Sequence, residues 1–305
     1  SYPYVDIIFG THTLHKLPED LYKKLDTLKK VEDVLDVDGK VYEGLPIKRE
    51  DKVKAQVTIM YGCNNFCSYC IIPYTRGKVR SKKCTDVLNE INTLVDNGHK
   101  EIVLTGIHTG HYGADLDLDF SDLLEKICMI DGLERLRISS IEVTELNDKF
   151  LRVLEKNNKI VDHLHIPIQS GCDKTLKDMN RKYNVNYFIE KIEQIRKIRS
   201  DISITTDLIV GFPNETIEDF NETLKNIEKI KFTKIHVFPF SLRKNTKAEL
   251  LPNHIGPEEK KKRARKLLEI SRELELAYYN KYLNIFPSEE HDGFFICKLK
   301  YERGK

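Results

Sequence analysis

Cys63, Cys67 and Cys70 are the residues of this chain whose type and spacing are best suited to chemistry. They lie four and three positions apart, directly behind an apolar run at 57–60 that predicts a buried strand. Gly62 and the Asn-Asn pair between the first two cysteines disfavour a helix and favour a loop. We therefore expect a loop at the carboxyl end of a strand to hold the three thiols together.

Four interpretations of this loop compete. On a helix, the same spacing would place three small buried apolar side chains on one face. A structural disulfide needs an oxidising compartment, and the seven-cysteine chain opens with no secretory signal. A zinc site needs a fourth ligand, and none follows at a recognisable spacing. Three thiolates on a 4Fe-4S cluster leave one iron open to a substrate or cofactor, and the neighbouring residues favour this interpretation.

A C-x3-C-x2-C spacing with an aromatic residue before the last cysteine is typical of radical S-adenosylmethionine (SAM) enzymes. The string from Gly62 to Gly77 closely resembles one branch of them, the methylthiotransferases that modify tRNA or a ribosomal protein. The resemblance implies that Cys63, Cys67 and Cys70 bind a catalytic 4Fe-4S cluster whose unique iron binds SAM. It assigns Tyr69 to the cofactor site, and it implies an electron donor such as flavodoxin or ferredoxin.

Short apolar runs alternate with helical patterns through the middle of the chain. The expected strands are 55–60, 101–106, 134–139, 163–168, 203–210 and 234–240. The expected helices are 84–97, 120–130, 147–156, 172–199 with a break near Tyr183, and 215–230. Apolar strands that are each followed by a helix indicate parallel pairing with right-handed crossovers. The sequence therefore predicts an α/β fold, an open partial (β/α)6 barrel over residues 51–245, which the resemblance makes the radical SAM core.

Residues 1–50 predict a strand at 5–10, a helix at 18–28 and a linker at 30–51. The resemblance implies that this piece is the remnant of an amino-terminal methylthiotransferase domain plus linker. In the family that domain supplies three further cysteines for a second 4Fe-4S cluster, but no cysteine precedes Cys63 here. The ligands of the second cluster are therefore absent, so we expect either a fragment or a chain that cannot complete sulfur insertion alone.

Residues 246–305 predict a long helix from Pro257 to about Tyr282, followed by a strand at 293–301. In the family a small all-β RNA-binding module follows the barrel. The resemblance therefore implies that this region is a helical extension and the start of such a TRAM-like module.

Polar and glycine-containing segments follow several of the predicted strands. The carboxyl ends of parallel strands meet at one rim, so we expect these segments to lie together. In the family, segments at these places hold the methionine, ribose and adenine of SAM. The residues that this resemblance assigns to the SAM pocket are Thr105, Gly106, Glu142, Gln169, Asp207 and Gly211.

Other histidines and cysteines have simpler expected roles. No spacing supports a second metal site, so local hydrogen bonds are expected for His108, His111, His163 and His165. Cys84 and Cys128 fall on predicted helices and are expected to pack as small apolar residues. Cys172 is expected near the mouth of the barrel, where an accessible thiol could be oxidised.

The overall charge is nearly balanced, with 50 lysines and arginines against 48 aspartates and glutamates. A net charge of +2 does not by itself indicate a nucleic-acid-binding protein, so any RNA contact must come from local patches of basic residues. A basic stretch beside the cysteine loop and one arginine past the last strand supply the RNA-binding candidates Tyr74, Arg76, Lys78, Arg80 and Arg243. A second basic stretch, 260–266, is expected to be a solvated helix face. No apolar run approaches membrane-spanning length, and a cytoplasmic location suits free thiolates.

Segments 104–108, 139–142 and 236–241 look like the methylthiotransferase branch that acts on N6-threonylcarbamoyladenosine next to the tRNA anticodon. The sister branch, acting on isopentenyladenosine, shows Gly-Gln-Asn where Gly106-Ile107-His108 stands here. A threonylcarbamoyl carboxylate would need a partner such as Arg76 or Arg243. The alternatives are isopentenyladenosine tRNA, another radical SAM reaction on the same barrel, or a zinc-stabilised RNA-binding protein without catalysis.

Overall fold

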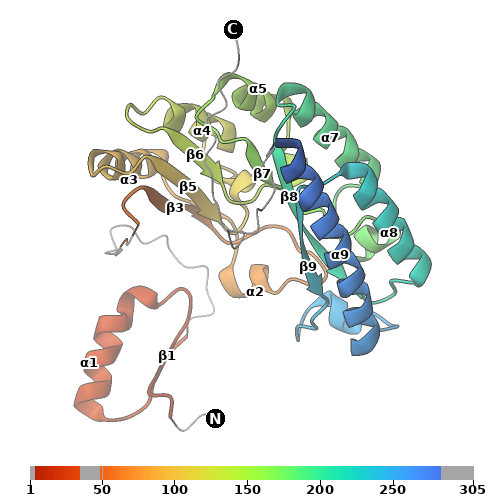
Figure 1. Ribbon diagram of the computed structural model, residues 1–305. Coiled ribbons are helices and arrows are strands. Elements are labelled where there is room, and N and C mark those ends of the chain that lie inside the picture. Colours follow the sequence, from red (N-terminus) through yellow and green to blue (C-terminus); the bar gives the residue numbers. More distant parts are fainter. Residues whose placement is uncertain (1–3, 35–48, 50, 283–305) are drawn as a thin grey trace, which may run out of the picture.

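A curled sheet of parallel strands forms the centre of the computed structural model, which describes residues 4–34, 49 and 51–282. In this part of the chain six parallel strands follow one another in sequence order: β3 (Lys54–Tyr61), β5 (Glu101–Gly106), β6 (Arg135–Ile138), β7 (His163–His165), β8 (Ser203–Val210) and β9 (Lys234–Pro239). They pair in two blocks, β3-β5-β6 and β7-β8-β9, and the short antiparallel strand β4 (Arg80–Ser81) lies beside β3. A parallel bridge between Leu136 and Ile160 joins the two blocks. Figure 1 shows that the sheet curls without closing, which confirms the expected open α/β half-barrel.

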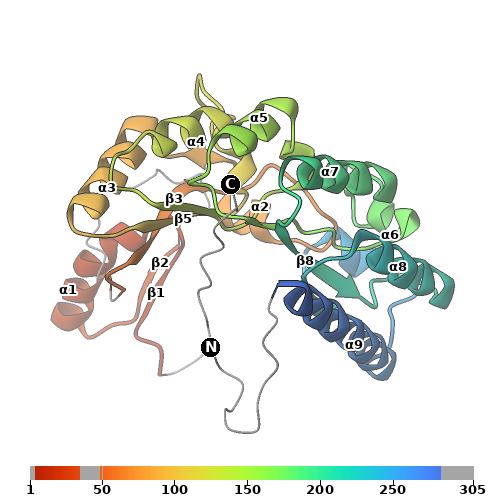
Figure 2. The ribbon, with the colours of Figure 1, turned by 45° about the horizontal axis from the view of Figure 1, so that its top comes forward.

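Helices cover the outer face of this sheet (Figure 2). They are α3 (Cys84–Asp96), α4 (Phe120–Cys128), α5 (Asp148–Lys156), α6 (Asp173–Asp178), α7 (Val185–Ile198), α8 (Ile217–Ile230) and α9 (Pro257–Tyr282). Their amino ends follow local capping chemistry: the side chains of Asp119 and Thr216 cap α4 and α8 through capping boxes. Asn184 accepts a hydrogen bond from the Tyr187 backbone N–H and begins α7, so the break expected near Tyr183 is confirmed.

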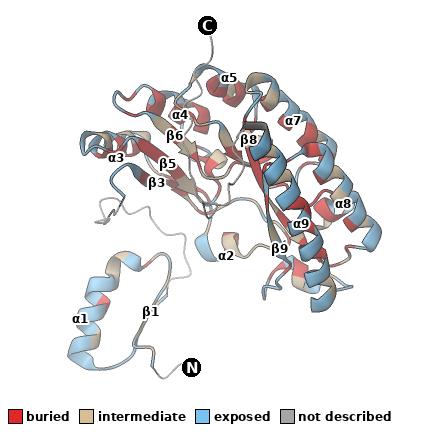
Figure 3. Cartoon of the chain, in the orientation of Figure 1, coloured by how far each residue is buried: buried red, intermediate tan, exposed pale blue. Residues whose placement is uncertain are grey.

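The core lies between the sheet and these helices. Val57 and Ile59 of β3, Ile102 of β5 and Phe150 of α5 are fully buried in one continuous cluster. In Figure 3 buried residues follow the strands and the inner faces of the helices. Burying a side chain of this size stabilises the fold by about 1.5–3 kcal/mol relative to leaving it exposed. Because this apolar core fixes the strands, their carboxyl ends are held at defined positions along one rim.

The amino-terminal piece is a separate small α/β unit in Figure 1. It contains β1 (Ile7–Phe9), η1 (Leu14–Lys16), α1 (Leu17–Thr27) and β2 (Val31–Asp33). β2 pairs in parallel with β1, so the expectation that the linker begins at residue 30 is wrong. The hydroxyl of Thr13 donates to the carbonyl of Asp33, the last residue of β2, at 2.6 Å. A local sequence pattern does not contain this contact between residues twenty positions apart. The domain boundaries near residues 50 and 245 stay predictions.

Helix α9 packs against the last strand of the sheet. Ala264, Leu267 and Ile270 are buried on its inner face. The Arg263 guanidinium lies 2.6 Å from a carboxylate oxygen of Glu215, and the two side chains are only 5% and 1% exposed. The expectation of a solvated basic face is therefore wrong for Arg263, although Arg265 is exposed as expected. The strand expected at 293–301 lies outside the described residues, and no helix within the described ranges is long and apolar enough to cross a membrane.

Breaking this buried pair should destabilise the protein. Arg263→Met leaves the Glu215 carboxylate buried without its cation, so we expect a loss of about 3 kcal/mol in the free energy of unfolding. Chemical denaturation followed by circular dichroism measures it. Arg265→Met on the exposed side of the same helix is the matched control and should change stability by less than about 0.5 kcal/mol. Equal effects of the two substitutions would contradict the assignment.

Candidate functional site

The loop that carries the three cysteines leaves β3 through a glycine that cannot be replaced without strain. Gly62 has φ of 71°, and a Cβ there would lie 1.9 Å from the carbonyl oxygen of Lys78. The Cys63 N–H donates to the carbonyl of Gly77 at 3.1 Å, and the Val79 N–H donates to the Asn64 side chain at 3.1 Å. These contacts fold the loop back onto the segment containing α2 (Ile72–Arg76) and β4 (Arg80–Ser81), two short elements that sequence patterns did not predict.

The other side of the loop is tied to distant parts of the chain. The Ser68 N–H donates to the carbonyl of Met179 at 3.0 Å, and its carbonyl accepts from the Ala248 N–H at 2.7 Å. The Asn180 amide donates to the carbonyl of Phe66 at 2.7 Å. Because backbone groups on both sides of Cys67 are paired, the loop has a fixed conformation.

The three cysteines share one cleft at the rim of the half-barrel. The cleft holds about 700 Å³ of space free of protein atoms, including its open mouth. It is lined by Cys63, Asn65, Cys67, Tyr69, Cys70, Ile72, Ile107, His108, Ser140, Glu142, Pro167, Gln169 and Arg181. The structure thus brings the predicted Tyr69, Glu142 and Gln169 together with the three thiols, which are all free.

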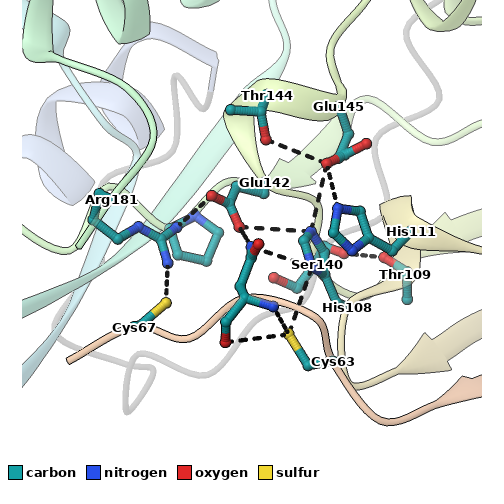
Figure 4. A network of polar contacts seen from close by, with 12 residues as sticks. Cys63, Cys67, His108, Thr109, His111, Ser140, Glu142, Thr144, Glu145 and Arg181 are labelled. Carbon is teal, nitrogen blue, oxygen red and sulfur yellow. Dashed lines mark hydrogen bonds and ion pairs between the residues drawn. The ribbon is translucent and has the colours of Figure 1, made fainter. Parts of the chain in front are cut away.

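Arg181 is the central charged residue of the cleft, and the sequence analysis missed it. Its guanidinium donates to the Cys67 sulfur at 3.1 Å and lies 3.0 Å from the Glu142 carboxylate (Figure 4). Its Nε donates to the Tyr183 hydroxyl at 3.2 Å. Burial raises the pKa of the Glu142 carboxyl, and the positive charge of Arg181 opposes that rise. A basic residue just before the predicted break in helix 172–199 is the available sequence signal.

His108, His111 and Glu145 form a polar group behind the first cysteine. The His108 Nδ1 lies 3.8 Å from the Cys63 sulfur, and the His111 Nε2 lies 3.1 Å from a Glu145 carboxylate oxygen. Burial lowers the pKa of His108 to about 4, so this imidazole is neutral at neutral pH. The expectation of local hydrogen bonds is confirmed for His163 and His165, which share the Thr205 hydroxyl. It holds for the His108 Nδ1, which lies 3.5 Å from the Asn65 amide nitrogen, whereas the His108 Nε2 has no hydrogen-bond partner in the described part of the chain.

Four residues expected in the SAM pocket lie in β5, in β8 or just after β8 but do not line this cleft. Thr105 shares a hydrogen bond with Thr58, and Gly106 packs so closely that a Cβ would lie 2.9 Å from the Met60 side chain. Asp207 lies 3.3 Å from His165. Gly211 has φ of 69° and packs under Lys260 of α9. Their assignment to SAM stays a prediction.

Outside the cleft, three further cysteines of the described residues, Cys84, Cys128 and Cys172, pack within the fold. Cys128 is buried in the core, and Cys84 packs against it, as expected. Cys172 is only 1% exposed, with its sulfur 3.7 Å from Asp219, so the expected accessible thiol is wrong. Cys172 precedes α6 directly, and its side chain points into the protein. A predicted loop does not specify the direction of its side chains.

The RNA-binding candidates do not line the cleft, and all of them except the half-buried Arg80 are exposed. Tyr74 is 52% exposed and packs edge-to-face against Phe66 at 5.7 Å. Arg76 and Lys78 are exposed, whereas the Arg80 guanidinium donates to the carbonyls of both. Arg243 is exposed in the loop after β9.

A comparison with models of protein families matches residues 57–227 to the model described as the Radical SAM superfamily. The chain belongs to the radical SAM superfamily. Its matched region runs from β3 to α8 and includes the cysteine loop and Arg181.

Curated relatives of this radical SAM chain include proteins named tRNA-2-methylthio-N(6)-dimethylallyladenosine synthase. The protein of Thermoanaerobacter sp. (strain X514) is 42% identical over 278 residues, covering 90% of this chain and 59% of its own length. That of Clostridium perfringens (strain 13 / Type A) is 43% identical over 271 residues, covering 88% and 61%. The chain thus spans about three fifths of the length of these relatives.

Solved structures share the fold at low sequence identity. Coproporphyrinogen III oxidase from Escherichia coli, described as a radical SAM enzyme, has a TM-score of 0.55 at 14% identity, covering 73% of this chain and 53% of that one. The radical SAM methyltransferase TsrM from Kitasatospora setae has a TM-score of 0.54 at 16% identity, covering 63% and 38%. Both support the half-barrel architecture.

Radical SAM enzymes use a 4Fe-4S cluster and SAM, and the cleft fits this pair. Cys63, Cys67 and Cys70 provide three thiols from one fixed loop, which leaves one iron for SAM. Burial raises the pKa of the Cys63 thiol to about 11 in the ligand-free chain, so cluster binding must displace its proton. Arg181 donates to the Cys67 sulfur and offsets negative charge there. When bound, the cluster and SAM supply the one-electron chemistry, and the cleft orients them and limits access of water.

The three thiols should act as one unit. After anaerobic reconstitution we expect about four irons per chain, and Cys67→Ala should lose most of the iron and all SAM cleavage while the circular dichroism spectrum is kept. Iron analysis and detection of 5′-deoxyadenosine measure this. Cys84→Ala, which alters a cysteine outside the cleft, is the control and should keep its iron. Iron loss in Cys84→Ala with retention in Cys67→Ala would overturn the ligand assignment.

Proposed function

We propose that this chain is the catalytic core of a radical SAM tRNA methylthiotransferase, which inserts sulfur and a methyl group into a modified adenosine. The observation that carries the proposal is the cleft itself, where three free thiols and a buried arginine open beside an exposed basic segment. The printed names of relatives at 42–43% identity, aligned along about nine tenths of this chain, support the same reaction.

The proposed partners are tRNA and a small electron donor such as flavodoxin or ferredoxin. Tyr74 offers an aromatic face for base stacking, and Arg76 and Lys78 offer positive charge for a phosphate backbone. These three residues follow the cysteine loop directly, so RNA bound to them would lie beside the cleft. The second 4Fe-4S cluster that the family resemblance implies finds no cysteine ligand before Cys63.

The proposed nucleoside is N6-threonylcarbamoyladenosine. Arg181 lines the cleft and Arg76 is exposed on the segment that follows the cysteine loop, and a carboxylate-bearing substituent needs a cation of this kind. Dimethylallyladenosine, also called isopentenyladenosine, is the second candidate. Two observations favour it: the names of the relatives, and the apolar side chains of Ile72 and Ile107, which also line the cleft.

Nucleoside analysis distinguishes these substrates. Because we expect this chain not to complete sulfur insertion by itself, the full-length gene that contains its coding region is expressed in a bacterial strain lacking its own tRNA methylthiotransferases, and digested tRNA is analysed by mass spectrometry. We expect methylthio-threonylcarbamoyladenosine, and none in cells carrying the Cys67→Ala variant. Accumulation of the methylthio-dimethylallyl nucleoside would replace the first candidate by the second. Absence of both products beside a cluster-loaded protein would contradict the proposed function.

The basic segment should bind RNA through its charge. Arg76→Ala combined with Lys78→Ala removes two exposed cations, so we expect weaker tRNA binding and a salt dependence reduced by about two phosphate contacts. Fluorescence anisotropy at several salt concentrations measures both. Lys225→Ala combined with Lys229→Ala on α8 is the charge-matched control and should leave binding unchanged. An unchanged salt dependence in the first variant would remove this segment from the RNA interface.

A further inference from the structure

A group of ligating side chains lies behind the cysteine loop, at the carboxyl ends of β5 and β6. His111 ends the turn η2 (Thr109–His111), and His108 is the residue before that turn. Glu145 ends η3 (Val143–Glu145). One ligand atom from each lies within 4.8 Å of the other two. Figure 4 shows the two imidazoles side by side, facing the Glu145 carboxylate. None of the three is one of the cysteines assigned to the cluster, although His108 also lines the cleft.

One buried nitrogen of this group, the His108 Nε2, lacks a hydrogen-bond partner in the described residues. The His108 side chain is only 7% exposed, yet its Nε2 makes no hydrogen bond within the described residues. Burying a polar atom without a partner is unfavourable, and such an atom in a folded protein calls for an explanation. A bound cation would supply the missing interaction.

The distances suit one metal ion. The Nε2 atoms of His111 and His108 lie 3.1 and 3.8 Å from the same Glu145 oxygen. Ligand atoms around a tetrahedral Zn²⁺, each about 2.0–2.1 Å from the metal, stand about 3.3 Å apart. The imidazole rings are stacked with centroids 3.8 Å apart and planes inclined by 26°. Both rings must therefore rotate about χ2 to aim their nitrogens at one point, and this torsion is soft.

We propose that His108, His111 and Glu145 bind one divalent transition-metal ion of the Zn²⁺ class, with the fourth position open to water or to a ligand in the cleft. Imidazole and carboxylate donors suit this class, and three protein ligands with an open position are the usual set of a reactive rather than a structural zinc. Glu142 does not complete the set, because Arg181 and Asn65 already engage its two oxygens.

Metal on the Nε2 of His108 would fix the proton on its other nitrogen. The Nδ1 then becomes a donor on the side of the ring that faces the Cys63 sulfur, 3.8 Å away before the ring rotates. The site therefore links two loops of the rim to a thiol of the cysteine loop. A second group of possible ligands consists of His165, Asp207 and His236. Both nitrogens of His165 are already paired, with Thr205 and Asp207, so this group has no unpaired His165 nitrogen to offer a metal.

Zinc analysis of the cluster-loaded chain tests the proposal. With the three thiols occupied, the protein is equilibrated with Zn²⁺, desalted, and analysed for zinc and iron by mass spectrometry. We expect about one zinc per chain in the wild type and at least a fivefold loss in His111→Gln and in Glu145→Gln, with iron unchanged. His236→Gln, which alters the other histidine group, is the matched control and should keep its zinc.

Zinc below about one fifth of an equivalent in the wild type, or equal zinc in the wild type and His111→Gln, would overturn the proposal. Circular dichroism verifies that each variant is folded. If the cluster does not load, the same titration is run with Co²⁺ on the chain carrying Cys63→Ala, Cys67→Ala and Cys70→Ala. The proposed site then predicts a visible absorption band without a sulfur-to-cobalt transition, and a spectrum without that band contradicts it. The metal readout is independent of methylthiotransferase activity.

Discussion

The ion pair between Arg181 and Glu142 is the interaction on which the cleft depends. Removing a guanidinium and a carboxylate from water costs several kcal/mol per ion, so a buried pair is weak support for stability by itself. Its value here is positional, because the two residues come from different parts of the rim: Glu142 follows β6, and Arg181 follows α6. Arg181 also contacts Cys67, so one guanidinium fixes the segment between α6 and α7, the loop after β6 and the cysteine loop relative to one another.

The geometry of the sheet explains why distant residues meet there. In a parallel half-barrel every strand ends at the same rim, and the core on its outer face holds those ends in register. The loop after β3 brings the thiols, the loop after β5 brings His108, and the loop after β6 brings Glu142. Residues nearly eighty positions apart in sequence, such as Asn65 and Glu142, consequently form a 2.7 Å hydrogen bond.

The strands and helices of the barrel could be predicted from sequence because each carries its own apolar period and caps. The strand at 203–210 was predicted with its observed bounds, and the Asn184 cap lies where the helix break was expected. The β2 strand has only three residues, and its pairing with β1 depends on contacts that a local pattern does not contain. Spacing in sequence likewise identified the three cysteines but not Arg181 or the His108 group, because their partners come from separate loops.

An open half-barrel, unlike a closed barrel, has two edge strands whose backbone groups can pair with another chain. In the described residues β4 is a strand of two residues, paired antiparallel, at the edge next to β3. At the opposite edge β9 ends in Pro239, which has no N–H to offer a new strand, and α9 packs against it. Very short edge strands, proline and a covering helix are established means of preventing edge-to-edge aggregation. The half-barrel therefore leaves its rim open to ligands, while both edges of its sheet are protected against pairing with other chains.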